Sequence, residues 1–270
     1  MNTVKLICLD IDRTLIDDSR TIPEENLKAV RAAHEEKGVH IAVNSGRIAS
    51  SARSFMKAMG VQEAFPSLGG CVVQNWDGSI IEEHFIDRGA ASEINALARK
   101  LGCALFLYTG DRWHLDPGYP FWQDSETRAT GLEGNITDTA RLLKTHSPNK
   151  MLAADMEAEK INRLRDEVRA SFSGSVDCFK SNDLYLEIVP AGINKGTAVD
   201  ALCRHYGIGR ENVMSIGDYY NDIDMFRASG IAVAMADSPA EVKEAATFVT
   251  QADCNGCGVA EAIRRFVLDV

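Results

Sequence analysis

The sequence predicts an α/β fold in which a Rossmann-like core with a parallel sheet is interrupted by an inserted α+β domain. Three observations lead to this prediction. From Val4 to about Gly70, apolar runs typical of buried strands alternate with amphipathic helical stretches. The pattern then changes character, and the strand–helix alternation resumes toward the C-terminus. We therefore expect residues 1–83 and 189–270 to form the core and residues 84–188 to form the inserted domain.

The first helix of the core is expected to begin with a capping box. Residues 21–24 are Thr-Ile-Pro-Glu, so that a hydroxyl precedes a glutamate by three residues and Pro23 occupies the first helical position. The helical pattern continues to Lys37, and Gly38 follows it as a helix end. The segment therefore predicts a helix that opens at Thr21 and runs through Lys37.

The remaining elements follow from the same periodicities. Within the core, the sequence predicts strands at 39–44, 213–216 and 231–234, helices at 48–59 and from Lys195 onward, and a hairpin at 71–81 that turns at Asp77 and Gly78. Within the insert, it predicts helices at 90–101 and 157–170 and strands at 103–108 and 184–189.

Composition limits the classes of function. Of 270 residues, 45% are hydrophobic and 25% charged, as in ordinary soluble globular proteins. The formal net charge of −10 argues against a nucleic-acid partner, because that binding depends on basic surfaces. No apolar stretch approaches a membrane span and no signal peptide is apparent, so we expect neither membrane insertion nor export. Seven scattered cysteines predict reduced thiols in a cytoplasmic protein, and for the C-x-x-C pair Cys254 and Cys257 we expect a structural or incidental role.

Two carboxylates follow the first buried-strand pattern. The apolar run in VKLICLDIDRTL predicts a strand that ends at Asp10 and Asp12. Burying two acids is costly unless they are paired. Ligands of parallel α/β sheets bind beyond the carboxyl ends of the strands. Asp10 and Asp12 therefore predict a site for a cation, a shared proton, or both.

A second acidic group follows another strand pattern near the C-terminus. The apolar run 213–216 meets Gly217, which predicts a sharp turn, and then Asp218, Asn221 and Asp222. Helix capping would explain either acidic group alone, because Asp and Asn are favoured at helix starts. Two such groups after two strands favour a functional site over capping.

Residues that can bind an anion lie between the two acidic segments of the sequence. Ser45, Gly46 and Arg47 follow a third strand pattern and lead into a helical stretch, where a hydroxyl and N–H groups can bind phosphate. Lys195 begins another amphipathic helix, and an isolated lysine there is ordinarily a solvated surface residue. Residues 192–197 resemble a Walker A loop only superficially, because they lack its glycine spacing and read Lys-Gly-Thr.

The ordered segments DIDRT, NSGR, NKG and GDYYND resemble the four motifs of the haloacid dehalogenase superfamily of phosphohydrolases. Their order, their spacing and the long insert between the second and third motifs are similar to those of its Cof-type, class IIB branch. The resemblance covers essentially the whole chain. It implies a catalytic core, a cap domain that closes over the site and selects the substrate, and a small phosphorylated metabolite, such as a sugar phosphate, as the substrate.

The resemblance also implies roles for the motif residues. Asp10 would be the nucleophile that forms an aspartyl-phosphate. Asp12 would protonate the leaving alkoxide and then deprotonate the attacking water, which requires a pKa raised relative to that of Asp10. Ser45, Gly46 and Lys195 would hold the phosphoryl oxygens, over which charge spreads in the transition state.

Mg²⁺ is the implied cofactor, because it would let a carboxylate and a phosphate approach each other despite their like charges. Its implied ligands are Asp10, the backbone carbonyl of Asp12, and Asp218, with Asp222 close by or acting through water. Asn221 would orient these groups by hydrogen bonds.

Three residues have supporting or peripheral roles by the same resemblance, and two positions depart from the family pattern. Thr14 would steady the loop after the nucleophile, and Arg47 and Asn194 are candidate contacts to substrate or phosphate. Arg13 stands where the family usually has glycine, and it could turn to solvent or reach the phosphate or the cap. Because both aspartates are present, we expect activity to be retained. Ser45 stands where threonine is common and keeps the hydroxyl.

Two alternatives to a phosphatase remain open at this point. A phosphomutase of the same superfamily would return the phosphoryl group to the substrate rather than to water. A non-enzymatic phosphoryl switch would also combine strand-end aspartates, a hydroxyl and a lysine. The long insert and the position of Asp12 argue against the switch, because a switch needs a long-lived aspartyl-phosphate and Asp12 is placed to hydrolyse it.

Overall fold

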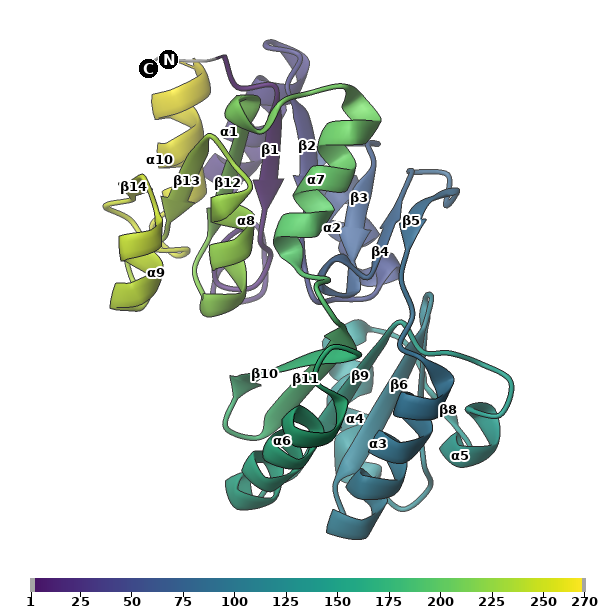
Figure 1. The fold of residues 1–270 in the computed structure, drawn as a ribbon. Coiled ribbons are helices and arrows are strands. Elements are labelled where there is room, and N and C mark those ends of the chain that lie inside the picture. Colours follow the sequence, from purple (N-terminus) through teal and green to yellow (C-terminus); the bar gives the residue numbers. More distant parts are fainter. Residues whose placement is uncertain (1–2, 269–270) are drawn as a thin grey trace. The chain divides into compact units, whose positions relative to one another are not determined.

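The computed structural model describes residues 3–268, which fold into two compact units (Figure 1). The core unit consists of the segments up to Gly46, Ala52–Glu82, and from Asn194 onward. The insert unit consists of Arg47–Ser51 and Glu83–Ile193. These units differ at their edges from the predicted segments, and the domain boundaries at 83/84 and 188/189 stay a prediction. Among the described residues, no helix combines the length and the hydropathy that crossing a membrane requires.

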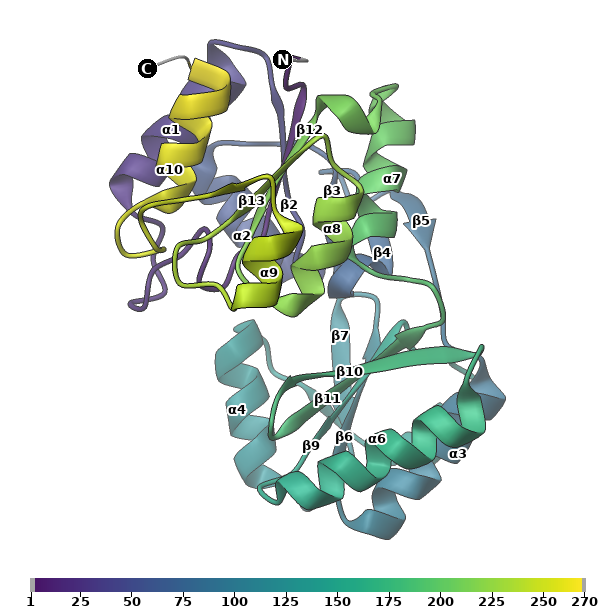
Figure 2. The same ribbon diagram turned by 60° about the vertical axis from the view of Figure 1, so that its left-hand side comes forward.

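The core unit is built on a five-stranded sheet whose neighbouring strands all pair in parallel, in the order β14-β13-β12-β1-β2. Leu9 of β1 lies opposite both Val43 of β2 and Ile216 of β12, so these three neighbouring strands end at nearly the same level. Helices cover both faces, with α1 and α10 on one side and α7 and α8 on the other (Figure 2). Coverage on both faces explains why the central strands are continuous apolar runs. The strands are β1 (Leu6–Leu9), β2 (His40–Val43), β12 (Val213–Gly217), β13 (Ile231–Ala234) and β14 (Phe248–Val249).

The helices of the core follow the predicted alternation with the strands. The predicted α/β class with a parallel core sheet is confirmed. The helices are α1 (Glu24–Glu35), α2 (Ala49–Met59), α7 (Lys195–Tyr206), α8 (Ile223–Arg227), α9 (Ala240–Ala245) and α10 (Gly258–Ile263).

The predicted capping box of the first helix is wrong. Helix α1 begins at Glu24 after Pro23, without a side-chain cap, and it ends at Glu35 rather than Lys37. The Thr21 hydroxyl lies 3.2 Å from Asp17 Oδ2 and 3.3 Å from Asp17 Oδ1, and the Thr21 N–H also donates to Asp17 Oδ1 at 3.0 Å. A carboxylate four residues earlier therefore takes the hydroxyl that would have capped the helix, because an ionised acceptor makes the stronger hydrogen bond.

The predicted hairpin forms near the C-terminal end of the core segment Ala52–Glu82. Strands β3 (Phe65–Ser67), β4 (Val72–Gln74) and β5 (Ile80–Glu83) make a small sheet in the order β3-β4-β5. The Gly78 N–H donates to the Asn75 carbonyl at 3.0 Å, and φ at Gly78 is +91°, a value that favours glycine.

The insert unit is a six-stranded, mostly antiparallel sheet in the order β10-β11-β9-β6-β7-β8. Helices α3 and α6 lie on one face (Figure 1), and their apolar side chains share one core with that face. The predicted helices and strands of this region are confirmed to within three residues at each end. The strands are β6 (Ala104–Thr109), β7 (Arg112–Leu115), β8 (Asn135–Ile136), β9 (Lys150–Ala154), β10 (Val176–Asn182) and β11 (Tyr185–Pro190), and the helices are α3 (Arg88–Leu101), α4 (Pro120–Thr130), α5 (Thr139–Leu142) and α6 (Ala158–Phe172).

Candidate active site

The candidate site lies at the carboxyl ends of the central strands of the core unit. Asp10 is the first residue after β1, and its N–H donates to the Ile216 carbonyl of β12 at 3.0 Å. The Asn44 N–H, directly after β2, donates to the Leu9 carbonyl at 2.7 Å. These bonds continue the sheet pairing past the strand ends, so the residues that follow three parallel strands are held at one edge.

Three acidic residues form a buried cluster at this edge. Carboxylate oxygens of Asp10, Asp218 and Asp222 all lie within 4.8 Å of one another, and all three residues are buried. Burial raises the pKa of Asp10 well above its usual range, although attraction to Lys195 lowers it in part. Burial and then repulsion from Asp222 raise the pKa of Asp218 to about 7.

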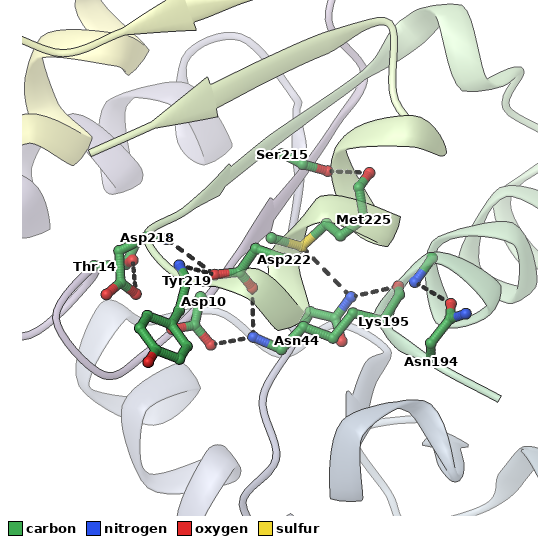
Figure 3. Close-up of polar contacts among 11 residues, drawn as sticks. Asp10, Thr14, Asn44, Asn194, Lys195, Ser215, Asp218, Tyr219, Asp222 and Met225 are labelled. Carbon is green, nitrogen blue, oxygen red and sulfur yellow. Dashed lines mark hydrogen bonds and ion pairs between the residues drawn. The ribbon is translucent and has the colours of Figure 1, made fainter. Parts of the chain in front are cut away.

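Lys195 is the cation of this cluster. It is the first residue of α7, it is 3% exposed, and its Nζ lies 2.5 Å from Asp10 Oδ1 and 2.6 Å from Asp222 Oδ1 (Figure 3). Burial opposes its charge, but attraction to Asp10 and Asp222 outweighs that cost and raises the pKa of Lys195. The ordinary interpretation of a surface lysine is therefore wrong here.

The cluster has the composition of a divalent-cation site. Three buried carboxylates face one buried ammonium group, so negative charge is in excess. Mg²⁺ prefers carboxylate oxygens, and carboxylates this close to one another favour a cation between them. The residues present therefore fit the predicted metal.

Asp222 has a second task in the loop after β12. Its Oδ2 accepts hydrogen bonds from the N–H groups of Asp218 at 2.9 Å and Tyr219 at 3.0 Å. A Cβ atom on Gly217 would lie 2.5 Å from this oxygen and 2.4 Å from the Asp222 Cγ. Gly217 was predicted to permit a sharp turn, but the structure uses it to leave space for the Asp222 carboxylate. Asn221 lies half-buried on the same 3₁₀ turn, Tyr220–Asp222.

The loop after the nucleophile is tied to the cluster by Thr14. Its hydroxyl lies 3.1 Å from Asp218 Oδ1, and the residue is fully buried. Asp12, two residues earlier, is exposed and pairs with Ile16 in an isolated parallel bridge. Asp12 is therefore outside the buried cluster and accessible to water, and its predicted roles stay predictions.

The residues after β2 form a loop that leads into α2, and their predicted binding of phosphate stays a prediction. Ser45 is buried, and its carbonyl accepts from the Gly69 N–H at 2.9 Å. Helix α2 begins only at Ala49, so Ser45 and Gly46 lie in a loop and not at the helix start. One N–H of the first helical turn, that of Ser50, already donates to Asp111 Oδ1 at 2.8 Å. The loop that contains Ser45 and Gly46, and not the N-terminus of α2, would therefore make the predicted contacts with phosphate.

Two residues proposed as substrate contacts make structural contacts. Asn194 Oδ1 accepts from the N–H groups of Gly196 at 2.9 Å and Thr197 at 3.0 Å, and so caps α7. Arg47 belongs to the insert unit, where its Nη1 donates to Ser51 Oγ at 3.1 Å and to the Ala129 carbonyl at 3.2 Å. Their predicted contacts to substrate stay predictions.

Sequence reasoning missed Asn44. This side chain is fully buried, and its Nδ2 donates to the Lys195 carbonyl at 2.9 Å (Figure 3). It therefore joins the end of β2 to the first residue of α7 and supports the position of Lys195. The available signal was an amide at the end of a buried strand, where a polar side chain needs a partner.

The pair of cysteines near the C-terminus lies apart from this chemistry. Cys254 is buried, Cys257 precedes α10 with φ of +66°, and both are free thiols. Burial raises the pKa of both, which favours the unreactive thiol.

Comparison with known proteins extends over nearly the whole chain. The model of a family described as haloacid dehalogenase-like hydrolases matches residues 7–263. A 5-amino-6-(5-phospho-D-ribitylamino)uracil phosphatase from Bacillus subtilis is 30% identical over 273 residues, which cover 98% of this chain and 96% of that protein. A solved haloacid dehalogenase-like hydrolase from Bacteroides thetaiotaomicron is 26% identical with a TM-score of 0.88, covering 97% of this chain and 99% of that one. A subclass IIB sugar phosphatase shares the fold, with a TM-score of 0.86 at 22% identity over 97% of this chain and 99% of that one.

Proposed function

This chain belongs to the haloacid dehalogenase-like hydrolases and is a phosphatase, and we propose that it hydrolyses small phosphorylated metabolites through an aspartyl-phosphate on Asp10. The observation that carries the proposal is the contact of Asp10 with Lys195 beside two further buried carboxylates. We further propose that the enzyme acts in the cytoplasm, which seven free thiols support.

The first step of the proposed reaction transfers the phosphoryl group to the protein. The Asp10 carboxylate attacks phosphorus, a new P–O bond forms, and the bond to the leaving oxygen breaks. Lys195 occupies Asp10 Oδ1, so Oδ2 is the oxygen that this ion pair does not use. Asp12 gives its proton to the leaving oxygen, which departs as an alcohol.

The second step restores the enzyme. Asp12, now ionised, takes a proton from water as the water oxygen attacks phosphorus, and the bond to Asp10 breaks to release inorganic phosphate. The exposure of Asp12 supports this role, because the residue must meet both the leaving group and water. Ser45 and Lys195 would hold the phosphoryl oxygens during both transfers.

Asp10, Asp218 and Asp222 would hold a Mg²⁺ ion, with the backbone carbonyl of Asp12 as a further predicted ligand. The bound ion would neutralise the charge between the nucleophilic carboxylate and the phosphate dianion. The contact of Thr14 with Asp218 would keep that carboxylate in place while the loop carries Asp12.

Phosphorylated sugars and polyols are the first substrate class to examine. The relative from Bacillus subtilis acts, by its name, on a compound that carries a phosphorylated ribityl chain. We propose the same class of phosphate monoester for this chain, on the strength of that relative alone.

The test is phosphate release from a panel of phosphorylated sugars and polyols and a generic aryl phosphate, with Mg²⁺ or with EDTA. We expect Mg²⁺-dependent release, and a loss of about 10³-fold or more in Asp10→Asn. Asp224→Asn is the matched control, because Asp224 lies on α8 and pairs with Arg227 outside the cluster. Isomerisation that depends on a sugar bisphosphate, with little release of phosphate, would replace the proposal with a phosphomutase.

A further inference from the structure

Arg13 adopts a backbone conformation that is unfavourable for its residue type. Its φ is +61°, in the left-handed region where glycine is at ease and a side chain is strained. It lies in the loop that carries Asp12 and Thr14, next to the cluster. Strained residues persist where surrounding contacts hold them, and they gather at functional sites. The contacts of the Arg13 side chain therefore need an explanation.

The guanidinium group of Arg13 lies between two carboxylates of different kinds. Its Nη2 donates to Asp237 Oδ2 at 2.6 Å, and its Nε lies 3.9 Å from Asp218 Oδ2. Asp218 is a buried member of the cluster, whereas Asp237 lies at the surface in the loop between β13 and α9. The Arg13 side chain is 63% exposed, so it has room to move toward either acid.

We propose that Arg13 is a positioning residue that weakens divalent-cation binding at Asp218, and that Asp237 limits this effect by holding the guanidinium away. The inference rests on the proposed cation site. An arginine is always charged, so it neutralises part of the Asp218 carboxylate when no cation is bound and repels a cation that binds there. Asp237 offers the guanidinium a second partner outside the cluster.

Lys195 does not have the role that we propose for Arg13. It is buried and contacts Asp10 and Asp222, so it is a fixed component of the cluster. Arg13 contacts Asp218, the remaining acid of the three, from the solvent side. The two cations therefore act on different carboxylates, and of the two only Arg13 is exposed.

The proposal predicts effects of opposite sign for its two partners. Arg13→Gly removes the competing charge and suits the left-handed φ, so we expect Mn²⁺ to bind roughly tenfold more tightly than to the original protein. Asp237→Asn frees the guanidinium for Asp218, so we expect Mn²⁺ to bind several-fold more weakly. When Asp237→Asn is combined with Arg13→Gly, it should change Mn²⁺ binding little, because the guanidinium group that it would release is absent.

The measurement is equilibrium binding of Mn²⁺ to the full chain without substrate, followed by the electron paramagnetic resonance signal of the free ion. Arg13→Gln repeats the removal of charge without glycine's flexibility, and Arg13→Lys keeps the charge as the matched control. Added salt should shrink the difference between Arg13→Gln and the original protein, because the Arg13 side chain is exposed. A purely structural role would give no such dependence on salt.

Two different failures can be told apart. Unchanged or weaker Mn²⁺ binding in both Arg13→Gly and Arg13→Gln would overturn the inference while leaving the cation site in place. No Mn²⁺ binding to any variant would overturn both the inference and the proposed cation site. If Asp237→Asn does not fold, the series at Arg13 still decides the question.

Discussion

Replacing Gly217 with alanine tests whether the position of Asp222 depends on the missing side chain. The φ at Gly217 lies outside the positive range, so alanine is allowed by the backbone. The added Cβ would nevertheless lie 2.4 Å from Asp222 Cγ, 2.5 Å from its Oδ2 and 2.7 Å from its Cβ. Carbon atoms in contact prefer about 3.5–4.0 Å, so either Asp222 or strand β12 must move.

The cost follows from what Asp222 would lose. Its carboxylate accepts from the N–H groups of Asp218 and Tyr219 and from the Lys195 ammonium group, and the residue is fully buried. Overpacking a filled site costs about 1–3 kcal/mol. A lost hydrogen bond to a charged group costs about 1.5–3 kcal/mol. We therefore expect Gly217→Ala to lower the free energy of unfolding by about 2–5 kcal/mol and to reduce phosphate release with it.

Urea unfolding, followed by circular dichroism, measures the stability change, and the phosphate-release assay measures the activity. Gly256→Ala is the matched control, since this exposed glycine also lacks a positive φ and its new Cβ would meet no atom closer than Ala252 Cβ at 3.0 Å, followed by Asp253 Oδ1 at 3.4 Å. We expect that control to stay within about 1 kcal/mol. A Gly217→Ala variant with unchanged stability and activity would refute the claim that Gly217 is needed to seat Asp222.

Three further variants test other contacts. Asn44→Ala removes the hydrogen bond to the Lys195 carbonyl, so it should cost about 1 kcal/mol in urea unfolding and lower kcat several-fold in the phosphate assay. Several hydrogen bonds lower the pKa of Asp17, and the largest effect is that of the Ser19 hydroxyl. The ionised carboxylate therefore stabilises the fold above the unfolded-state pKa, and this stabilisation is lost as pH falls through the lowered, folded-state pKa. Asp17→Asn should therefore lower the melting temperature at pH 7, with a smaller difference below pH 3.8. Burial raises the pKa of Glu126, so its contribution to stability is complete below the unfolded-state pKa of 4.5 and is lost as pH rises through the folded pKa. Glu126→Gln should gain stability relative to the original protein between pH 4.5 and 8 in thermal melts, and a constant difference across that range would contradict the assignment.

The parts of the site that follow from strand ends were predictable from the sequence. Asp10, Asp218 and Asp222 come together because parallel strands of one sheet end at the same edge, and the apolar runs before these acids mark the strands. Lys195 was different, because nothing in its local pattern distinguishes it from a surface lysine. Its place depended on the family resemblance, and its burial follows from the packing of α7.

The parts that failed depend on contacts that a local pattern does not contain. The motif at 21–24 satisfies the rule for a capping box, yet Asp17 is a stronger acceptor for the Thr21 hydroxyl. The role of Asn44 was not predicted, because its hydrogen-bond partner, the Lys195 carbonyl, is 151 residues away along the chain. The space at Gly217 is likewise set by a side chain that only the folded loop places against it.

Asp222 shows why capping and function are not competing explanations of an acid after a strand. A carboxylate has two oxygens, and each can accept separate hydrogen bonds. Oδ2 of Asp222 holds the loop through the N–H groups of Asp218 and Tyr219, whereas Oδ1 contacts the Lys195 ammonium group. The loop contact fixes the carboxylate, and the fixed carboxylate in turn places Lys195 against Asp10. The hydrogen bonds that Asp222 makes to the loop are therefore required for its contact with Lys195. Loop capping and a role in the site are both properties of this one aspartate, and they are not alternatives.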